Sequence, residues 1–284
     1  MSKTYGTFQQ ARTVTELPRK GGHITIQPFG DIHRDSHNCN VEKWKTFLAK
    51  AKETHTDHTY YIGMGDYNDF ASYSERKALH TLHESTMAKM DEWAQGDIDT
   101  LCEEMSFMKG HLLGLHHGNH EWKFQDGSLA TERMCEYFGC PFLGIASFVR
   151  ISIDFKGGNR KTIDIFGSHG KGGGRLLGSP YNSLEKMSNI FNDADIYLMG
   201  HDHHKGCLSK TVLSVDSHFK LKQKRQWFAR TGSFLNGWVQ DEPSYVVNAM
   251  YAPTDLGVVR FDCHFTRTTK KGKDIIIKDI HSWS

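Results

Sequence analysis

The chain has 284 residues, of which 38% are hydrophobic and 24% are charged, the proportions of an ordinary globular protein rather than a disordered tail or a fibre. The net charge of +2 is too small to indicate a nucleic-acid or membrane surface, and no apolar run reaches the roughly 18 residues of a membrane span. The 18 histidines are an excess that favours metal binding or acid–base chemistry.

The first 22 residues and the cysteines predict a cytoplasmic protein with no membrane partner. Residues 1–22 contain no apolar core of a secretory signal. The six cysteines form no C-x-x-C pair, which argues against a disulfide framework and against a thiolate zinc site. We therefore expect reduced thiols.

In the first half of the chain, apolar residues alternate between strand and helix spacing. The pattern predicts a strand at 23–29, a helix at 41–54, a strand at 60–62, a helical insertion at about 74–109, a strand at 112–115 and a helix at 129–138.

The second half is richer in strands. Residues 148–155 and 161–166 alternate strongly on either side of Gly157-Gly158-Asn159, which indicates a hairpin. A helix at 183–191 and a strand at 196–199 follow, and beyond residue 207 the pattern predicts strands at 211–215, 226–230, 256–265 and 274–280. No repeat or linker divides the chain, so we expect a single domain over 1–284, with a strand-rich part at about 207–284. The order of elements predicts an α/β fold, a four-layer α/β/β/α sandwich of two mixed sheets with a helical insertion.

Five short polar clusters follow predicted strands, in a position where open α/β sheets place their sites. They are Asp31-Ile32-His33, Gly65-Asp66-Tyr67-Asn68-Asp69, Gly118-Asn119-His120-Glu121, Ser168-His169-Gly170 and Gly200-His201-Asp202-His203. Any one of them could be a polar turn. All five, however, combine a ligand-type residue with a glycine or a tight loop, which favours a shared site.

In this order the clusters read D-x-H, G-D-x-x-D, G-N-H-E, an isolated H and G-H-x-H, and they resemble the signature of the calcineurin-like metallophosphoesterases. The resemblance implies a two-sheet sandwich with a dinuclear metal centre at its edge. It also implies roles by position: Asp31, His33 and His203 on one metal, Asn119, His169 and His201 on the other, Asp66 bridging both, and His120 as an acid oriented by Asp69.

The residue types are consistent with this chemistry. One carboxylate can bridge two cations roughly 3.5–4 Å apart, as Asp66 would do. A mixed nitrogen and oxygen site favours transition metals over Mg or Ca, so we expect two divalent ions, manganese first, with iron, zinc, nickel or cobalt as alternatives. The metals would activate a bridging water for in-line attack on phosphorus, and His120 would protonate the leaving oxygen.

Three basic residues are candidates for substrate binding. Lys171 and Arg175 flank three glycines directly after His169, where a loop could hold a phosphate or could simply be a flexible surface loop. Arg34 follows the D-x-H cluster and could reach the phosphate or be an ordinary surface arginine.

The sequence favours a phosphodiesterase that acts on a nucleotide or a nucleic acid, and a nuclease is included in that prediction. Protein Ser/Thr phosphatases of the same superfamily carry Arg-Gly after the second aspartate, whereas here Asp69 is followed by Phe70-Ala71. The chain after His203 is too short for the large DNA-capping domain of the repair nucleases. A phosphomonoesterase and a non-catalytic binding module on the same scaffold are the alternatives.

Overall fold

A computed structural model describes residues 8–70, 84–172, 176, 178–270 and 273–284. The described strands are β1 (Phe8–Leu17), β2 (Gly21–Phe29), β3 (Thr59–Gly63), β4 (Leu112–His116), β5 (Phe142–Gly144), β6 (Ala146–Phe155), β7 (Arg160–Ser168), β8 (Ile196–Met199), β9 (Lys205–Val215), β10 (Leu221–Ser233), β11 (Gly257–Val258), β12 (Arg260–Lys270) and β13 (Lys273–Trp283). The described helices are α1 (Val41–Glu53), α3 (Glu84–Glu104), α4 (Ala130–Phe138), α5 (Ser179–Glu185), α6 (Met187–Ile190) and α7 (Tyr245–Asn248), with a 3-10 turn η1 at Ser106–Met108.

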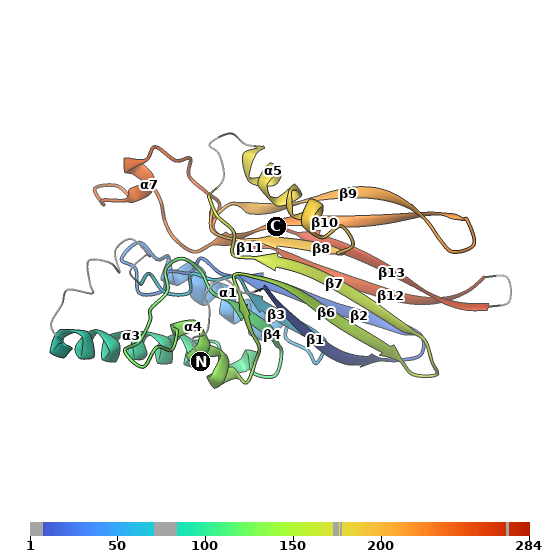
Figure 1. Ribbon diagram of the computed structural model, residues 1–284, viewed down its shortest axis with the longest axis horizontal. Helices are drawn as coiled ribbons and strands as arrows, with labels where there is room; N and C mark the ends of the chain where they lie inside the picture. The colour runs from blue at the N-terminus through green and yellow to red at the C-terminus, as the bar shows by residue number, and fades with distance from the viewer. Residues whose placement is uncertain (1–7, 71–83, 173–175, 177, 271–272) are drawn as a thin grey trace.

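The strands form one large mixed sheet, and helices lie on both sides of it (Figure 1). The mixed α/β class is thereby confirmed. The hydrogen-bonded order is β11-β10-β8-β7-β6-β1-β5-β4-β3-β2-β12-β13, with β9 paired to β10. The predicted hairpin is present: β6 and β7 pair antiparallel, and Gly157, Gly158 and Asn159 all have the positive φ that such a turn requires.

Strand β1 joins the two halves of this order, and it is missing from the sequence prediction. It pairs in parallel with β6 along its whole length and meets β5 at the single pair Phe8–Gly144. The described hydrogen bonds therefore form one continuous path where the sequence predicted two separate sheets.

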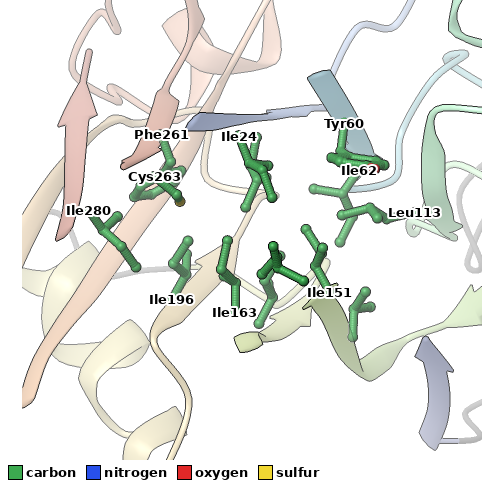
Figure 2. Close-up of a cluster of buried hydrophobic side chains, with 14 of the residues drawn as sticks. Ile24, Tyr60, Ile62, Leu113, Ile151, Ile163, Ile196, Phe261, Cys263 and Ile280 are labelled. Carbon is green, nitrogen blue, oxygen red and sulfur yellow. The ribbon is translucent and has the colours of Figure 1, made fainter. Parts of the chain in front are cut away.

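The two arms of the sheet on either side of β1 share one buried core. Inward residues alternate along each strand, as at Ile24 and Ile26 in β2 and at Ile151 and Ile153 in β6. Burying each such side chain stabilises the fold by roughly 1.5–3 kcal/mol. Figure 2 shows the arms facing each other, with Ile24, Ile62 and Phe261 on one side and Ile151, Ile163 and Ile196 on the other.

Helices cover the outer faces of both arms. Helices α1, α3 and α4 pack over β2, β3 and β4 through a second cluster that includes Trp44, Tyr61 and Leu101. Helices α5 and α6 pack over β7, β8 and β10 through a third cluster that includes Leu184 and Tyr197. These clusters fix the loops at the ends of the covered strands.

The predicted helices at 74–109 and 183–191 have other bounds in the structure. Helix α3 forms most of the predicted insertion, whose residues 74–83 lie outside the described part of the chain. The predicted helix at 183–191 begins earlier, at Ser179, because Pro180 fits the first turn, where a missing N–H leaves no helical bond unmade. None of the helices described here is long and apolar enough to cross a membrane.

Candidate metal centre

The loops that follow five strands converge at one place. Asp31 lies two residues after β2, Asp66 three after β3, Asn119 three after β4, His169 directly after β7 and His201 two after β8. Strands β2, β3 and β4 are mutually parallel, and β7 is parallel to β8. Because parallel strands end at the same edge, each arm brings its ligand-type residues to one side.

Asp31, His33 and His203 form the first candidate ligand set, all three buried, with one candidate ligand atom of each within 4.8 Å of the others. His33 Nδ1 donates to Asp69 Oδ1 at 2.8 Å. His33 Nε2 is then buried without any hydrogen-bond partner among the described residues. A buried orphan nitrogen of this kind is rare in folded proteins, and a metal ion would satisfy it.

Asp66, His169 and His201 form the second set under the same criterion, and Asn119 joins them. His169 Nε2 lies 3.0 Å from Asn119 Oδ1 and 3.2 Å from His201 Nδ1, and His201 Nδ1 lies 2.7 Å from Asn119 Oδ1. His169 Nδ1 donates to the Met64 carbonyl at 2.7 Å, which turns Nε2 toward the other ligand atoms. Ring nitrogens and an amide oxygen thus converge at one point, an arrangement that suits a cation.

Asp66 lies between the two sets. Its Oδ2 is 3.3 Å from His169 Nε2 and 4.0 Å from His33 Nε2, while its Oδ1 accepts the His120 backbone N–H at 2.9 Å. The Asp66 carboxylate is therefore placed to serve both sets.

Burial and mutual contact shift the pKa values of Asp31, Asp66 and His169. Burial raises the pKa of Asp31 to about 7. Burial also works to raise the pKa of Asp66, but the neighbouring His169 outweighs it and the net pKa is below its usual range. For His169, burial lowers the pKa but Asp66 outweighs it, and the result is about 9. His169 therefore holds a proton against Asp66, where a bound cation would supply the positive charge instead.

Burial favours the neutral form of two further candidate ligands, His201 and His203. Burial lowers the pKa of His201 to about 4 and holds the pKa of His203 well below its usual value. Neutral imidazole is the form that binds metal.

His120 and Asp69 adjoin the ligands without belonging to the two sets. His120 Nδ1 lies 3.0 Å from Asp69 Oδ1 and 3.0 Å from the Phe70 carbonyl. Burial lowers the pKa of His120, but the hydrogen bond to Asp69, the charges of Asp66 and Asp69 and the Phe70 carbonyl together outweigh burial and raise the net pKa. Asp69 Oδ1 thus contacts both His120 and the ligand His33, a double contact that the sequence did not indicate.

The backbone at the ligands is in the left-handed region. Positive φ is uncommon for residues other than glycine and costs of the order of 1–3 kcal/mol each. Here it occurs at five of the candidate ligands, with φ between 46° and 72°: Asp31, His33, Asp66, His201 and His203. Such clustering is typical of functional sites, where the surrounding fold imposes the conformation.

Two of the three predicted substrate-binding residues, Arg34 and Lys171, lie in the described part of the chain. The Arg34 guanidinium forms a two-point ion pair with Glu104, with Nε and Nη2 at 3.1 and 2.7 Å from Oε1. Lys171 is exposed, and Arg175 lies outside the described residues. Substrate contact by these residues stays a prediction.

Arg230 is a buried residue at the site that the sequence analysis missed. Its side chain is fully buried and donates to the carbonyl oxygens of Gly200, at 3.0 Å, and Pro180, at 2.7 Å, and it pairs with Asp202 at 3.2 Å. It therefore holds the loop that carries His201 against helix α5. A lone arginine directly after the apolar run Trp227-Phe228-Ala229 was the available signal.

Comparison with known proteins adds little to this geometry. No protein-family model matches the chain, and no curated protein matches it either. Among solved structures, Vacuolar Protein Sorting 29 from Cryptosporidium parvum aligns over 92% of this chain and 99% of its own, with 12% sequence identity and a TM-score of 0.35. A similarity at that level carries no argument about fold or function, so the functional conclusion depends on the site itself.

Proposed function

We propose that this protein is a metal-dependent phosphoesterase of the calcineurin-like type, with two metal ions per chain. The observation that carries the proposal is the convergence of two ligand sets on the single carboxylate of Asp66. The donors are imidazole nitrogens and carboxylate or amide oxygens, a set that suits manganese first and also iron, zinc, nickel or cobalt. His33 Nε2, buried and unpartnered, supports the fit.

The two candidate ligand sets would each hold a divalent cation, and such ions would supply an activated water and neutralise charge on the phosphate. The side chains of the protein do the rest. His120 Nδ1 is engaged by Asp69, so its other ring nitrogen is available to carry the proton that the leaving oxygen needs. Asp69 fixes the His120 tautomer and, because it raises the His120 pKa, keeps that proton in place.

We propose a phosphodiester, in a nucleotide or a nucleic acid, as the substrate. A doubly charged monoester benefits from a fixed arginine, whereas a diester carries one negative charge. The arginine nearest the ligands in sequence, Arg34, is neutralised by Glu104, which supports the diester.

We also propose the finer features of this architecture and location. The three separate hydrophobic clusters support a four-layer sandwich, in which the outer two clusters lie under helices and the middle one lies between the arms. A single domain over 1–284 and a cytoplasmic location remain part of the proposal, and the six free cysteines are consistent with reduced thiols.

The experiment is a comparison of an aryl phosphodiester with its monoester on metal-reconstituted protein, followed by cyclic nucleotides and single- and double-stranded nucleic acids. We expect kcat/KM for the diester to exceed that for the monoester at least tenfold, and Asp66→Asn to abolish turnover. Asp279→Asn, at an exposed position of β13, is the matched control and should keep full activity. A monoester preference would indicate a phosphomonoesterase, and no turnover with any of the metals would indicate a binding module.

A further inference from the structure

The structure contains a cavity of about 590 Å³ to which none of the metal-centre residues contributes. Its walls come from helix α1, from Phe234 directly after β10, from β11 and β12, and from residues 283–284, with single residues of β2 and β9 completing the lining. The volume lies within the range of roughly 300–1,000 Å³ that small-molecule sites occupy.

One face of helix α1 forms a wall of this cavity. The lining residues fall at the spacing i, i+3, i+4, i+7 and i+11, which places them on one side of a helix: Lys43, Thr46, Phe47, Lys50 and Thr54. Lys43 and Lys50 lie two turns apart, about 10 Å along the axis. Both are exposed, and neither has an ion-pair partner in the described ranges. Lys45, on another face of the helix, pairs instead with Glu42.

Two further cationic residues line the cavity, and both form ion pairs with aspartates. Lys205 bonds to Asp255, and Arg260 bonds to Asp262 at 2.9 Å. Of the side chains that line the cavity, four are cationic and one, Asp262, is anionic. The two unpaired lysines on α1 therefore leave the cavity electropositive.

Aromatic rings form the remaining surface. Phe47 and Phe234 lie with ring centroids 5.5 Å apart. Trp283 is 64% exposed, and its indole N–H donates to Asp262 Oδ2 at 2.9 Å, which fixes the orientation of the ring. An exposed, oriented indole beside cationic side chains is suited to stack on a flat aromatic ring of an anionic ligand.

We propose that this cavity binds a small anion with an aromatic ring, of the class of a nucleoside 5′-phosphate. Lys43 and Lys50 hold the phosphate, and the base lies against Trp283. The cavity shares no residue with the metal centre, so this site is separate from the proposed catalytic site and does not depend on the presence of metal.

Isothermal titration calorimetry on chelator-treated full-length protein tests this site without the metal centre being loaded. The probes are AMP, ATP, adenosine and inorganic phosphate. We expect AMP and ATP to bind with a stoichiometry of one, and adenosine and phosphate to bind at least tenfold more weakly than AMP. Failure here leaves the phosphoesterase proposal untouched, because that proposal is tested by turnover with metal.

Charge reversal locates the binding. Lys43→Glu with Lys50→Glu should weaken AMP binding at least tenfold. The matched control, Lys45→Glu with Lys52→Glu, makes the same charge change on the same helix outside the cavity and should leave AMP affinity within twofold. Trp283→Ala should also weaken AMP binding at least tenfold while leaving phosphate affinity unchanged, since the ring and not the anion loses its contact.

Three results would overturn the proposal. The first is that neither AMP nor ATP binds to a protein whose thermal unfolding shows it to be folded. The second is that phosphate binds as tightly as AMP. The third is that the Lys43/Lys50 and Lys45/Lys52 double variants lose AMP affinity equally. The third result would mean that the anion responds only to the net charge of the protein or binds outside the cavity.

Discussion

Gly118→Ala is expected to damage the metal centre through one methyl group. Gly118 precedes the ligand Asn119, and a Cβ at this position would lie 2.6 Å from Asp66 Cγ and 2.5 Å from the Asp66 backbone nitrogen, overlapping Oδ1 as well. Rotation of the Asp66 side chain cannot relieve the clash between the new Cβ and the Asp66 backbone nitrogen. The loop that carries Asn119 and the loop that carries Asp66 must therefore move apart.

The size of the effect follows from this displacement. Restoring ordinary contact distances separates the two loops by about 1 Å, and a misplacement of that size costs on the order of 10²-fold in rate. We expect kcat/KM for an aryl phosphodiester to fall about 10²-fold, and the metal content of reconstituted protein to fall below that of the wild type. Metal analysis and diester hydrolysis, measured on the same preparation, are the assays.

Gly96→Ala is the matched control for this substitution. Gly96 lies in helix α3, and a Cβ there would meet nothing within 4 Å. Alanine is favoured over glycine inside a helix by roughly 1 kcal/mol, so this variant should unfold at a slightly higher temperature with unchanged activity. If Gly118→Ala kept wild-type metal content and turnover, the reasoning about Asp66 would be refuted.

Three further predictions concern protons. His120→Asn should keep most of its metal yet lose turnover by roughly 10²–10⁴-fold, with a smaller loss for leaving groups of low pKa; an equal loss across a leaving-group series would contradict the general-acid role. A general acid works in its protonated form, so activity should fall as pH rises through the His120 pKa, which Asp69 raises. Asp69→Asn should move this basic limb of the kcat/KM profile to lower pH. A basic limb that does not move would contradict the effect of Asp69 on His120. Metal loading of metal-free protein at pH 7 should release at least about one proton, because the pKa of His169 is about 9 and that of Asp31 about 7. Metal affinity should therefore rise with pH. Calorimetry in buffers of different ionisation enthalpy measures the proton release, and loading that releases no proton would contradict those values.

The parts that could be predicted from the sequence are those with a local signal. The hairpin at residues 148–166 is set by alternation and by two adjacent glycines, both visible in a short window. Asp31 and His201 could be placed near one another because each follows a buried apolar strand within two residues. The assignment of ligands to two metals came from the resemblance, since spacing alone does not divide them.

The parts that escaped prediction depend on contacts far apart in the chain. Strand β1 is half-exposed along most of its length and is stabilised by pairing with β6, more than a hundred residues away. The sequence offered Arg34 as a candidate phosphate ligand, but in the structure it forms an ion pair with Glu104 on α3, 70 residues along the chain. The left-handed backbone at His33 and Asp66 has no sequence signal, because neither is glycine and the conformation is imposed by the surrounding fold.

The number of metal ions bound per chain tests the central claim most directly. Elemental analysis of protein reconstituted with manganese and then desalted should give two ions per chain. Asp66→Ala should give at most one, because both sets lose the carboxylate that they share. A wild-type protein that retains no metal, or an Asp66→Ala variant that retains the full two, would contradict the account.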